Sequence, residues 1–146
     1  MPANDAPSSR HQVAARPWVL LVVDDEPDIL AAIADLVEHE IPGVKVLQAA
    51  SGRQGLDALQ SERVDGIISD FKMPDMDGLQ FLIIARQCHP TIPRVMLTAY
   101  PDPVLTRLAN DDAAVQAFLS KALEPEDLLD QVCALLTYEP AIRPAP

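Results

Sequence analysis

Five short apolar runs alternate with helix-like segments along the central part of this chain, and this alternation restricts its fold more than any other feature. The first run, Trp18 to Val23, is apolar throughout, which is typical of a strand buried on both faces. The other runs occupy residues 44–49, 66–69, 94–97 and 115–119. Strands that alternate with helices are joined by crossover connections, so the pattern predicts an α/β fold with a parallel sheet and helices on both faces.

Start signals precede each of the five predicted helices: Glu26-Pro27, Ser51, the loop 71–78, Asp102-Pro103 and Pro125. The fourth helix has a weaker pattern, with Val104, Leu105 and Leu108 as its apolar residues. The last helix has the clearest pattern, with leucine or valine at five spaced positions.

The two ends differ in composition from this central part. Residues 1–17 are rich in Pro, Ala, Ser and Asn and predict a disordered N-terminal tail. Residues 138–146 include three prolines and predict a Pro-rich tail or linker. One domain is therefore expected over residues 18–137, a size that one hydrophobic core can support.

The net charge of −11 argues against direct binding to nucleic acid or to an anionic membrane, since both favour a basic surface. No apolar run approaches the roughly 20 residues of a membrane span, and residues 1–17 lack the apolar stretch of a signal peptide. We therefore expect a cytoplasmic protein. Cys88 and Cys133 have no metal-ligand spacing and are expected to be reduced, partly buried thiols.

Residues able to do chemistry follow four of the predicted strands. Asp24 and Asp25 end the first strand, Asp70 ends the third, Thr98 ends the fourth, and Lys121 follows the fifth. The carboxyl ends of parallel strands meet at one edge of the sheet, where open α/β folds bind ligands. The pattern therefore predicts one site with three carboxylates, a hydroxyl and an ammonium group.

Three carboxylates at one edge repel one another, by about 4 kcal/mol for a pair ~4 Å apart at an effective dielectric constant of 20. A divalent cation removes this cost, and an all-oxygen ligand set favours Mg²⁺ or Mn²⁺ over Zn²⁺. A carboxylate beside such a cation can attack a phosphoryl group and form an aspartyl phosphate. Lys121 is placed to neutralise the phosphoryl oxygens, and Thr98 to donate a hydrogen bond to them.

The segments that contain these residues resemble the receiver domain of two-component response regulators, of the chemotaxis-regulator type, over about residues 18–137. The matching segments are Asp24-Asp25-Glu26, Ser69 to Gly78, Leu97-Thr98-Ala99 and Phe118 to Lys121. The Met73-Pro74 and Asp77-Gly78 pairs make the second segment specific. The resemblance implies a doubly wound, five-stranded parallel sheet in the flavodoxin-like strand order 2-1-3-4-5.

The resemblance also implies a role for each residue at the acceptor. Asp70 is expected to be the phosphoacceptor. Asp25, Asp70 and the backbone carbonyl of Lys72 are expected to bind Mg²⁺ or Mn²⁺, with Asp24 acting through water. Lys121 is expected to pair with the phosphoryl group.

Further residues are implied to control the response. Thr98 is expected to move toward the phosphoryl group, and Phe118 to swing inward into the space that Thr98 leaves. In the family, two side chains flank the path of the hydrolytic water, and here they are Lys72 and Tyr100. A cation and a bulky ring at these positions predict slow loss of the phosphoryl group.

From this resemblance, the chain is expected to be a signalling switch and not an enzyme that acts on separate substrates. Its expected phosphoryl donor is a sensor histidine kinase or a phosphotransfer protein, and its expected output surface is about residues 103–136. Homodimer formation on phosphorylation fits the same resemblance. Two forms of output remain open: a stand-alone regulator that contacts a downstream protein, and the N-terminal receiver of a larger regulator whose effector domain is absent from this chain.

Two other classes of protein fit less well. A haloacid-dehalogenase phosphatase has an Asp-x-Asp pair after its first strand, whereas Asp24 and Asp25 are adjacent. A dinucleotide-binding module needs a Gly-rich turn there, which this chain lacks.

The chain also departs from the receiver pattern, because Ala122 replaces the usual proline after the lysine. Since a cis bond before a residue other than proline costs about 2.5–4 kcal/mol, the Lys121–Ala122 bond is predicted to be trans.

Overall fold

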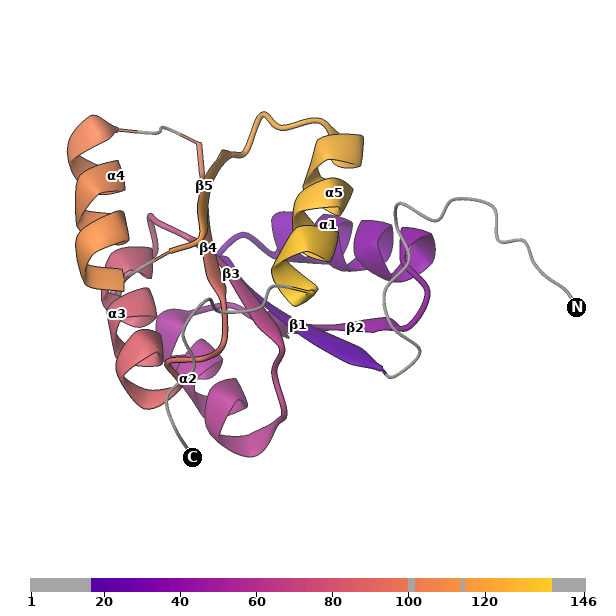
Figure 1. Ribbon diagram of the computed structural model, residues 1–146, viewed down its shortest axis with the longest axis horizontal. Coiled ribbons are helices and arrows are strands. Elements are labelled where there is room, and N and C mark those ends of the chain that lie inside the picture. The colour runs from indigo at the N-terminus through magenta and orange to yellow at the C-terminus, as the bar shows by residue number, and fades with distance from the viewer. Residues whose placement is uncertain (1–16, 100–101, 114, 138–146) are drawn as a thin grey trace, which may run out of the picture.

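The computed structural model describes residues 17–99, 102–113 and 115–137, so the predicted tails lie, except for Pro17, outside the described residues. Strands and helices alternate through these ranges (Figure 1). The elements are β1 (Trp18–Val23), α1 (Pro27–Glu40), β2 (Val44–Ala49), α2 (Gly52–Ser61), β3 (Gly66–Asp70), α3 (Gly78–Cys88), β4 (Arg94–Thr98), α4 (Pro103–Leu108), the π-helical segment η2 (Ala109–Ala113), β5 (Ala117–Ser120) and α5 (Pro125–Leu136).

The five strands form one parallel sheet in the order β2-β1-β3-β4-β5, which confirms the predicted fold and strand order. Val23 lies level with Ser69, the residue before Asp70, in the β1–β3 pair. Asp70 in turn lies level with Leu97, the residue before Thr98, in the β3–β4 pair. This register brings the carboxyl ends of the central strands together at one edge.

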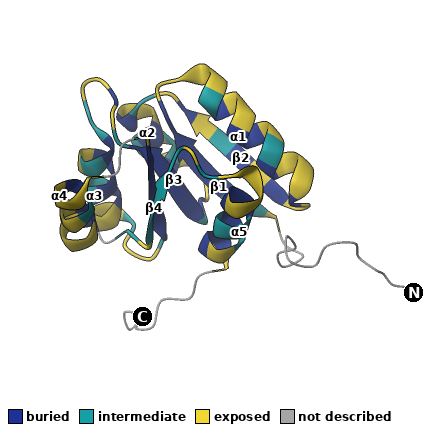
Figure 2. Cartoon of the chain, turned by 90° about the horizontal axis from the view of Figure 1, so that it is seen from above, coloured by how far each residue is buried: buried dark blue, intermediate teal, exposed yellow. Residues whose placement is uncertain are grey.

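Helices cover both faces of the sheet, with α1 and α5 on one side and α2, α3 and α4 on the other (Figure 1). Alternate residues of β1 enter opposite cores: Leu20 and Val22 pack with α1 and α5, and Leu21 and Val23 pack with α2 and α3. Figure 2 shows the buried strands between helices whose outer surfaces are exposed. Burial from both sides explains why the first apolar run has no polar residue.

The fourth helix differs from the prediction. Leu105 is buried, but Val104 is 68% exposed and Leu108 is 41% exposed, so only one of the three apolar residues named from the sequence faces the core. The helix continues into η2, where Ala109 and Ala113 are fully buried. The wider turn of a π-helix shifts the inward face, and two small alanines take the place expected for large side chains.

Three smaller expectations have mixed outcomes. β5 begins at Ala117, two residues later than predicted. Cys133 is a half-buried free thiol as expected, whereas Cys88 is exposed because it ends α3 beyond that helix's buried face. Among the described residues no peptide bond is cis, which confirms the predicted trans bond between Lys121 and Ala122.

None of the helices in the described ranges has both the length and the apolar character required to cross a lipid bilayer.

The first turn of α3 rests directly on the end of β3. Asp77 and Gln80 form a capping box at the start of α3, each side chain accepting a hydrogen bond from the other's backbone N–H. The N–H of Gly78 donates to the carbonyl of Phe71 at 2.7 Å. A Cβ atom at position 78 would lie 1.9 Å from the carbonyl oxygen of Asp70. Glycine, which has no Cβ atom, is therefore the residue that permits this close approach.

We expect Gly78→Ala to lower the free energy of unfolding by about 1–3 kcal/mol or more, because the new methyl group meets backbone atoms that cannot move aside. Gly52→Ala is the matched control, since Gly52 also begins a helix but the three atoms nearest to a Cβ there belong to the flexible side chain of Met76 and not to backbone. Urea unfolding of both variants measures the difference. Equal losses in the two variants would contradict this account of Gly78.

Candidate functional site

Three carboxylates gather where β1 and β3 end. Asp24, Asp25 and Asp70 each place an oxygen within 4.8 Å of the others. Asp24 and Asp70 are buried, with 2% and 6% of their surfaces exposed, whereas Asp25 is exposed. Two of the three charges are therefore held away from solvent and need partners within the protein.

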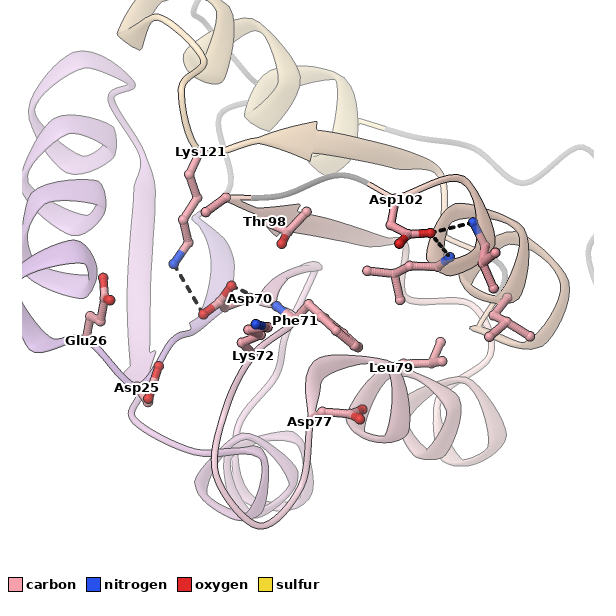
Figure 3. A pocket seen from close by; sticks show the side chains of 14 residues that line it. Asp25, Glu26, Asp70, Phe71, Lys72, Asp77, Leu79, Thr98, Asp102 and Lys121 are labelled. Atoms are coloured by element: carbon pink, nitrogen blue, oxygen red, sulfur yellow. Dashed lines mark hydrogen bonds and ion pairs between the residues drawn. The ribbon is translucent and has the colours of Figure 1, made fainter.

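Lys121 supplies that partner. Its Nζ atom lies 2.8 Å from Oδ2 of Asp24 and 3.2 Å from Oδ2 of Asp70. The backbone N–H of Lys121 donates to the carbonyl of Thr98, which holds the end of β5 beside the end of β4. Figure 3 shows the lysine side chain extending from the turn after β5 toward Asp70. Three carboxylates and one ammonium group leave the cluster with a net negative charge.

Each of the two buried carboxylates is bonded through both oxygens, one to Lys121 and the other to a backbone N–H. Asp24 uses both oxygens within the protein, because Oδ1 also accepts a hydrogen bond from the N–H of Glu26 at 2.9 Å. Asp70 accepts from Lys121 through Oδ2 and from the N–H of Phe71 through Oδ1, at 2.8 Å. The hydroxyl of Ser69 donates to the backbone carbonyl of Asp70 at 2.9 Å. The backbone and side chain of Asp70 are thus both held in place.

Burial and neighbouring groups shift the pKa of Asp70 in opposite directions. Burial raises the pKa of its carboxyl group above the ordinary value, and the charge of Asp24 raises it further. Lys121 and the Phe71 N–H oppose this rise without cancelling it. Desolvation acts to lower the pKa of Lys121, but the hydrogen bond to Asp24 and the two carboxylate charges outweigh it and raise that pKa. The lysine is therefore held in its charged form.

The acidic cluster opens into a pocket of about 630 Å³. At one end of this pocket lie Asp25, Asp70 and Lys121, and Figure 3 shows Thr98 and Lys72 beside them. The other end is a groove between α3 and α4 and is lined mainly by apolar side chains: Leu79, Val104, Leu105 and Leu108. Asp70 therefore faces an open space large enough for a phosphoryl group.

The structure brings together six of the site residues predicted from sequence: Asp24, Asp25, Asp70, Lys72, Thr98 and Lys121. Phe118 is half-buried on β5, packs against the core on the α2–α3 side and does not line the pocket. Tyr100 lies outside the described residues. The structure thus assembles the acceptor end of the predicted site, while Phe118 lies apart from it.

The sequence predicts Asp102 only as the start of a helix, but this residue also lines the pocket. Its Oδ1 atom accepts hydrogen bonds from the N–H groups of Val104 and Leu105 and so caps α4. The Asp-Pro pair gives the capping signal, whereas the position beside the acceptor depends on where α4 packs.

The chain is similar in sequence to bacterial regulators. It is 35% identical to the transcriptional regulatory protein GlrR of Escherichia coli (strain K12), a match that covers 80% of this chain and 26% of that protein. It is 34% identical to the response regulator MprA of Mycolicibacterium vanbaalenii, covering 82% of this chain and 51% of that protein. The chain therefore spans about a quarter to a half of the length of these relatives.

Solved structures with the same fold include the signal receiver domain of an HD domain-containing protein from Pseudomonas fluorescens Pf-5, with a TM-score of 0.78 and 30% identity. That match covers 83% of this chain and 95% of the other. The chemotaxis protein CheY4 of Vibrio cholerae has a TM-score of 0.76 and 30% identity, covering 82% and 99% of the two chains.

The model of the response regulator receiver domain family matches residues 20–133, which include β1 after its first two residues, all of β2 to β5 and most of α5. The match thus contains the acidic cluster, Thr98 and Lys121, the residues that the sheet brings together at one edge. This chain belongs to the response regulator receiver domain family.

Proposed function

We propose that Asp70 accepts a phosphoryl group from the phosphohistidine of a sensor histidine kinase or a phosphotransfer protein. The observation that carries this proposal is that Asp70 alone among the three clustered carboxylates both lines the pocket and contacts Lys121. Asp24 contacts the lysine but does not line the pocket. Asp25 lines the pocket without a described bond to the lysine.

In the proposed reaction, a carboxylate oxygen of Asp70 forms a bond to phosphorus while the P–N bond of the donor breaks and the imidazole takes up a proton. Lys121 lies within 3.2 Å of Asp70, so its ammonium group can pair with the phosphoryl oxygens. Thr98 is the neighbouring hydroxyl that lines the same pocket.

A divalent cation, Mg²⁺ or Mn²⁺, fits the acidic end of this pocket. The clustered side chains offer only oxygen ligands and carry more negative charge than Lys121 offsets. We assign the binding to Asp25, Asp70 and the carbonyl of Lys72, with Asp24 acting through water because, unlike Asp25 and Asp70, it does not line the pocket. When bound, the cation supplies positive charge to the phosphoryl oxygens.

The switch belongs to the same proposal. Thr98 moves toward the phosphoryl group, and Phe118, which is half-buried next to β4, moves inward. The output surface is then about residues 103–136, where Val104 and Leu108 are already exposed. Homodimer formation through this surface is one way to transmit the change.

Two forms of output are proposed for the whole protein. Receiver domains of this family act with histidine kinases and effector domains, and the relatives GlrR and MprA are longer regulators. Their length supports the first form, in which this chain is the N-terminal receiver of a larger regulator. The second form is a stand-alone regulator that contacts a downstream protein. In either form this acidic domain does not itself bind nucleic acid, and it meets its donor in the cytoplasm.

We expect Asp70→Asn to abolish phosphorylation by acetyl phosphate with Mg²⁺, because the amide lacks the nucleophilic oxygen anion. Asp75→Asn is the matched control: Asp75 is an exposed residue of the same loop, and its φ of 71° is one that asparagine also tolerates. Intact-protein mass spectrometry measures the added phosphoryl group. Single-site labelling that persists in Asp70→Asn would refute the assignment.

We expect Asp25→Asn to weaken Mg²⁺ binding by at least about tenfold, since it removes a negative charge beside the cation. Glu26→Gln removes an equal charge from the adjacent residue, which lines the same pocket but is not assigned as a ligand. Calorimetry is the suitable measurement because Trp18, the one tryptophan, begins β1 at the end away from the site. If Asp25→Asn and Glu26→Gln weaken binding equally, Asp25 is not a ligand.

We expect the Lys72→Asn, Tyr100→Glu double variant to lose its phosphoryl group faster than the wild type. Lys72 is exposed beside Asp70 in the pocket, where its charge can pair with phosphoryl oxygens and its bulk can hinder an in-line water. The decay of the mass-labelled protein after removal of acetyl phosphate gives both rates. An unchanged decay rate would show that these side chains do not control the lifetime.

A further inference from the structure

Two arginine side chains bind the carboxyl end of the helix formed by α4 and η2. Arg86, in the last turn of α3, donates from Nη1 to the carbonyls of Asp111 and Asp112, at 3.3 and 3.1 Å. Arg94, the first residue of β4, donates from Nε to the carbonyl of Ala113 at 2.8 Å. Three consecutive carbonyls are thus held by guanidinium groups from two other elements.

This arrangement satisfies groups that a helix end leaves without partners. The last carbonyls of a helix lack intrahelical donors and form its negative end, so cationic donors stabilise them. Arg94 is only 3% exposed, and its Nη1 atom also donates to the carbonyl of Ile92 at 2.6 Å. A guanidinium group buried to this degree fixes the position of the carbonyls that solvate it.

The same end of the helix is also the end that packs on the rest of the domain. Ala109 and Ala113 are fully buried, and η2 packs against α3. Their small side chains let the π-helical backbone approach its neighbours closely. Side-chain packing and guanidinium bonds therefore act on the same five residues.

The amino half of the helix is held differently. The cap of α4 is local, since Asp102 accepts from Val104 and Leu105 through its side chain and from the Thr106 hydroxyl through its backbone. Leu105 is the one buried side chain of α4, whereas Val104 and Leu108 are exposed. This half borders the pocket that contains Asp70.

We propose that Arg86 and Arg94 form a fixed pivot for the α4–η2 helix, so that a chemical change at Asp70 displaces residues 102–108 while η2 stays docked on α3 and β4. The second part of this inference rests on the proposed phosphorylation of Asp70. Displacement about the pivot widens or narrows the apolar groove between Leu79 of α3 and the exposed side chains of α4. Arg86 and Arg94 are thus positioning residues for the output helix.

Amide hydrogen exchange of the full chain, with and without acetyl phosphate and Mg²⁺, tests the pivot. In the wild type, we expect phosphorylation to change exchange over residues 102–108 and to leave residues 109–113 unchanged. Arg86→Ala and Arg94→Met are each expected to speed exchange at residues 109–113 by about tenfold even without phosphorylation, because each removes a charge-assisted hydrogen bond. After phosphorylation, the change in these variants is expected to spread into η2.

Arg107→Ala is the matched control, since Arg107 is an exposed arginine of α4 that is not one of the two arginines bonded to these carbonyls. Amide exchange of this variant at residues 109–113 is expected to equal that of the wild type. Arg86 is exposed, so Arg86→Ala tests the pivot even if Arg94→Met fails to fold. Wild-type exchange at residues 109–113 in Arg86→Ala would overturn the proposal. So would a wild-type response to phosphorylation as large in η2 as in residues 102–108.

Failure of the proposed function has a separate signature. If Asp70 is not the acceptor, acetyl phosphate adds no mass at that residue, while exchange in the untreated arginine variants still reports whether η2 is anchored.

Discussion

The Lys121 ammonium group lies 2.8 Å from Asp24 and 3.2 Å from Asp70, between two carboxylates that the ends of β1 and β3 bury side by side. Without this cation, the two charges would face each other with little solvent to separate them. The parallel sheet makes the interaction possible, because its strand order places β1, β3, β4 and β5 in sequence along one edge. The fold brings these charges together, and the lysine makes their proximity tolerable.

The compensation is incomplete, and this has a chemical consequence. Burial and the charge of Asp24 raise the pKa of Asp70 despite the lysine, so ionised Asp70 is less stable in the folded protein than in water. An added cation lowers that cost. The burial of Asp70 beside Asp24 therefore lowers the stability of the fold but favours ligands that bring positive charge to the pocket. Stability and function place opposite demands on this site.

The central part of this architecture could be predicted from sequence because each signal has a simple physical basis. A strand such as β1 that is buried on both faces has to be apolar throughout, and parallel strands have to end at the same edge. The sequence alone therefore places Asp70 and Thr98 together. The sequence could not predict that Lys121 lies closer to Asp24 than to Asp70, or that Asp24 also accepts from the Glu26 N–H. These details depend on distances that differ by a few tenths of an ångström.

The α4–η2 helix shows where the sequence signals fail. Val104 and Leu108 have apolar side chains at helical spacing, yet both are exposed, because buried alanines and the π-helical turn set the orientation of this segment. Hydrophobic periodicity assumes a regular helix and cannot detect such a turn. The guanidinium bonds of Arg86 and Arg94 are equally hidden from sequence reasoning, because their partners are backbone carbonyls, which every sequence contains.

The described contacts of α3 connect these two parts of the molecule. Its first residue, Gly78, rests on the backbone of Asp70, and Arg86 in its last turn holds carbonyls of η2. A single regular helix therefore joins the backbone of the proposed acceptor to the carboxyl end of the α4–η2 helix. Because α3 is buried along Phe81, Leu82 and Ala85, it resists bending between these two contacts. In the proposed pivot, a change confined to the Asp70 side chain leaves β3, α3 and η2 in their mutual positions, whereas residues 102–106 are joined by hydrogen bonds that stay within their own segment.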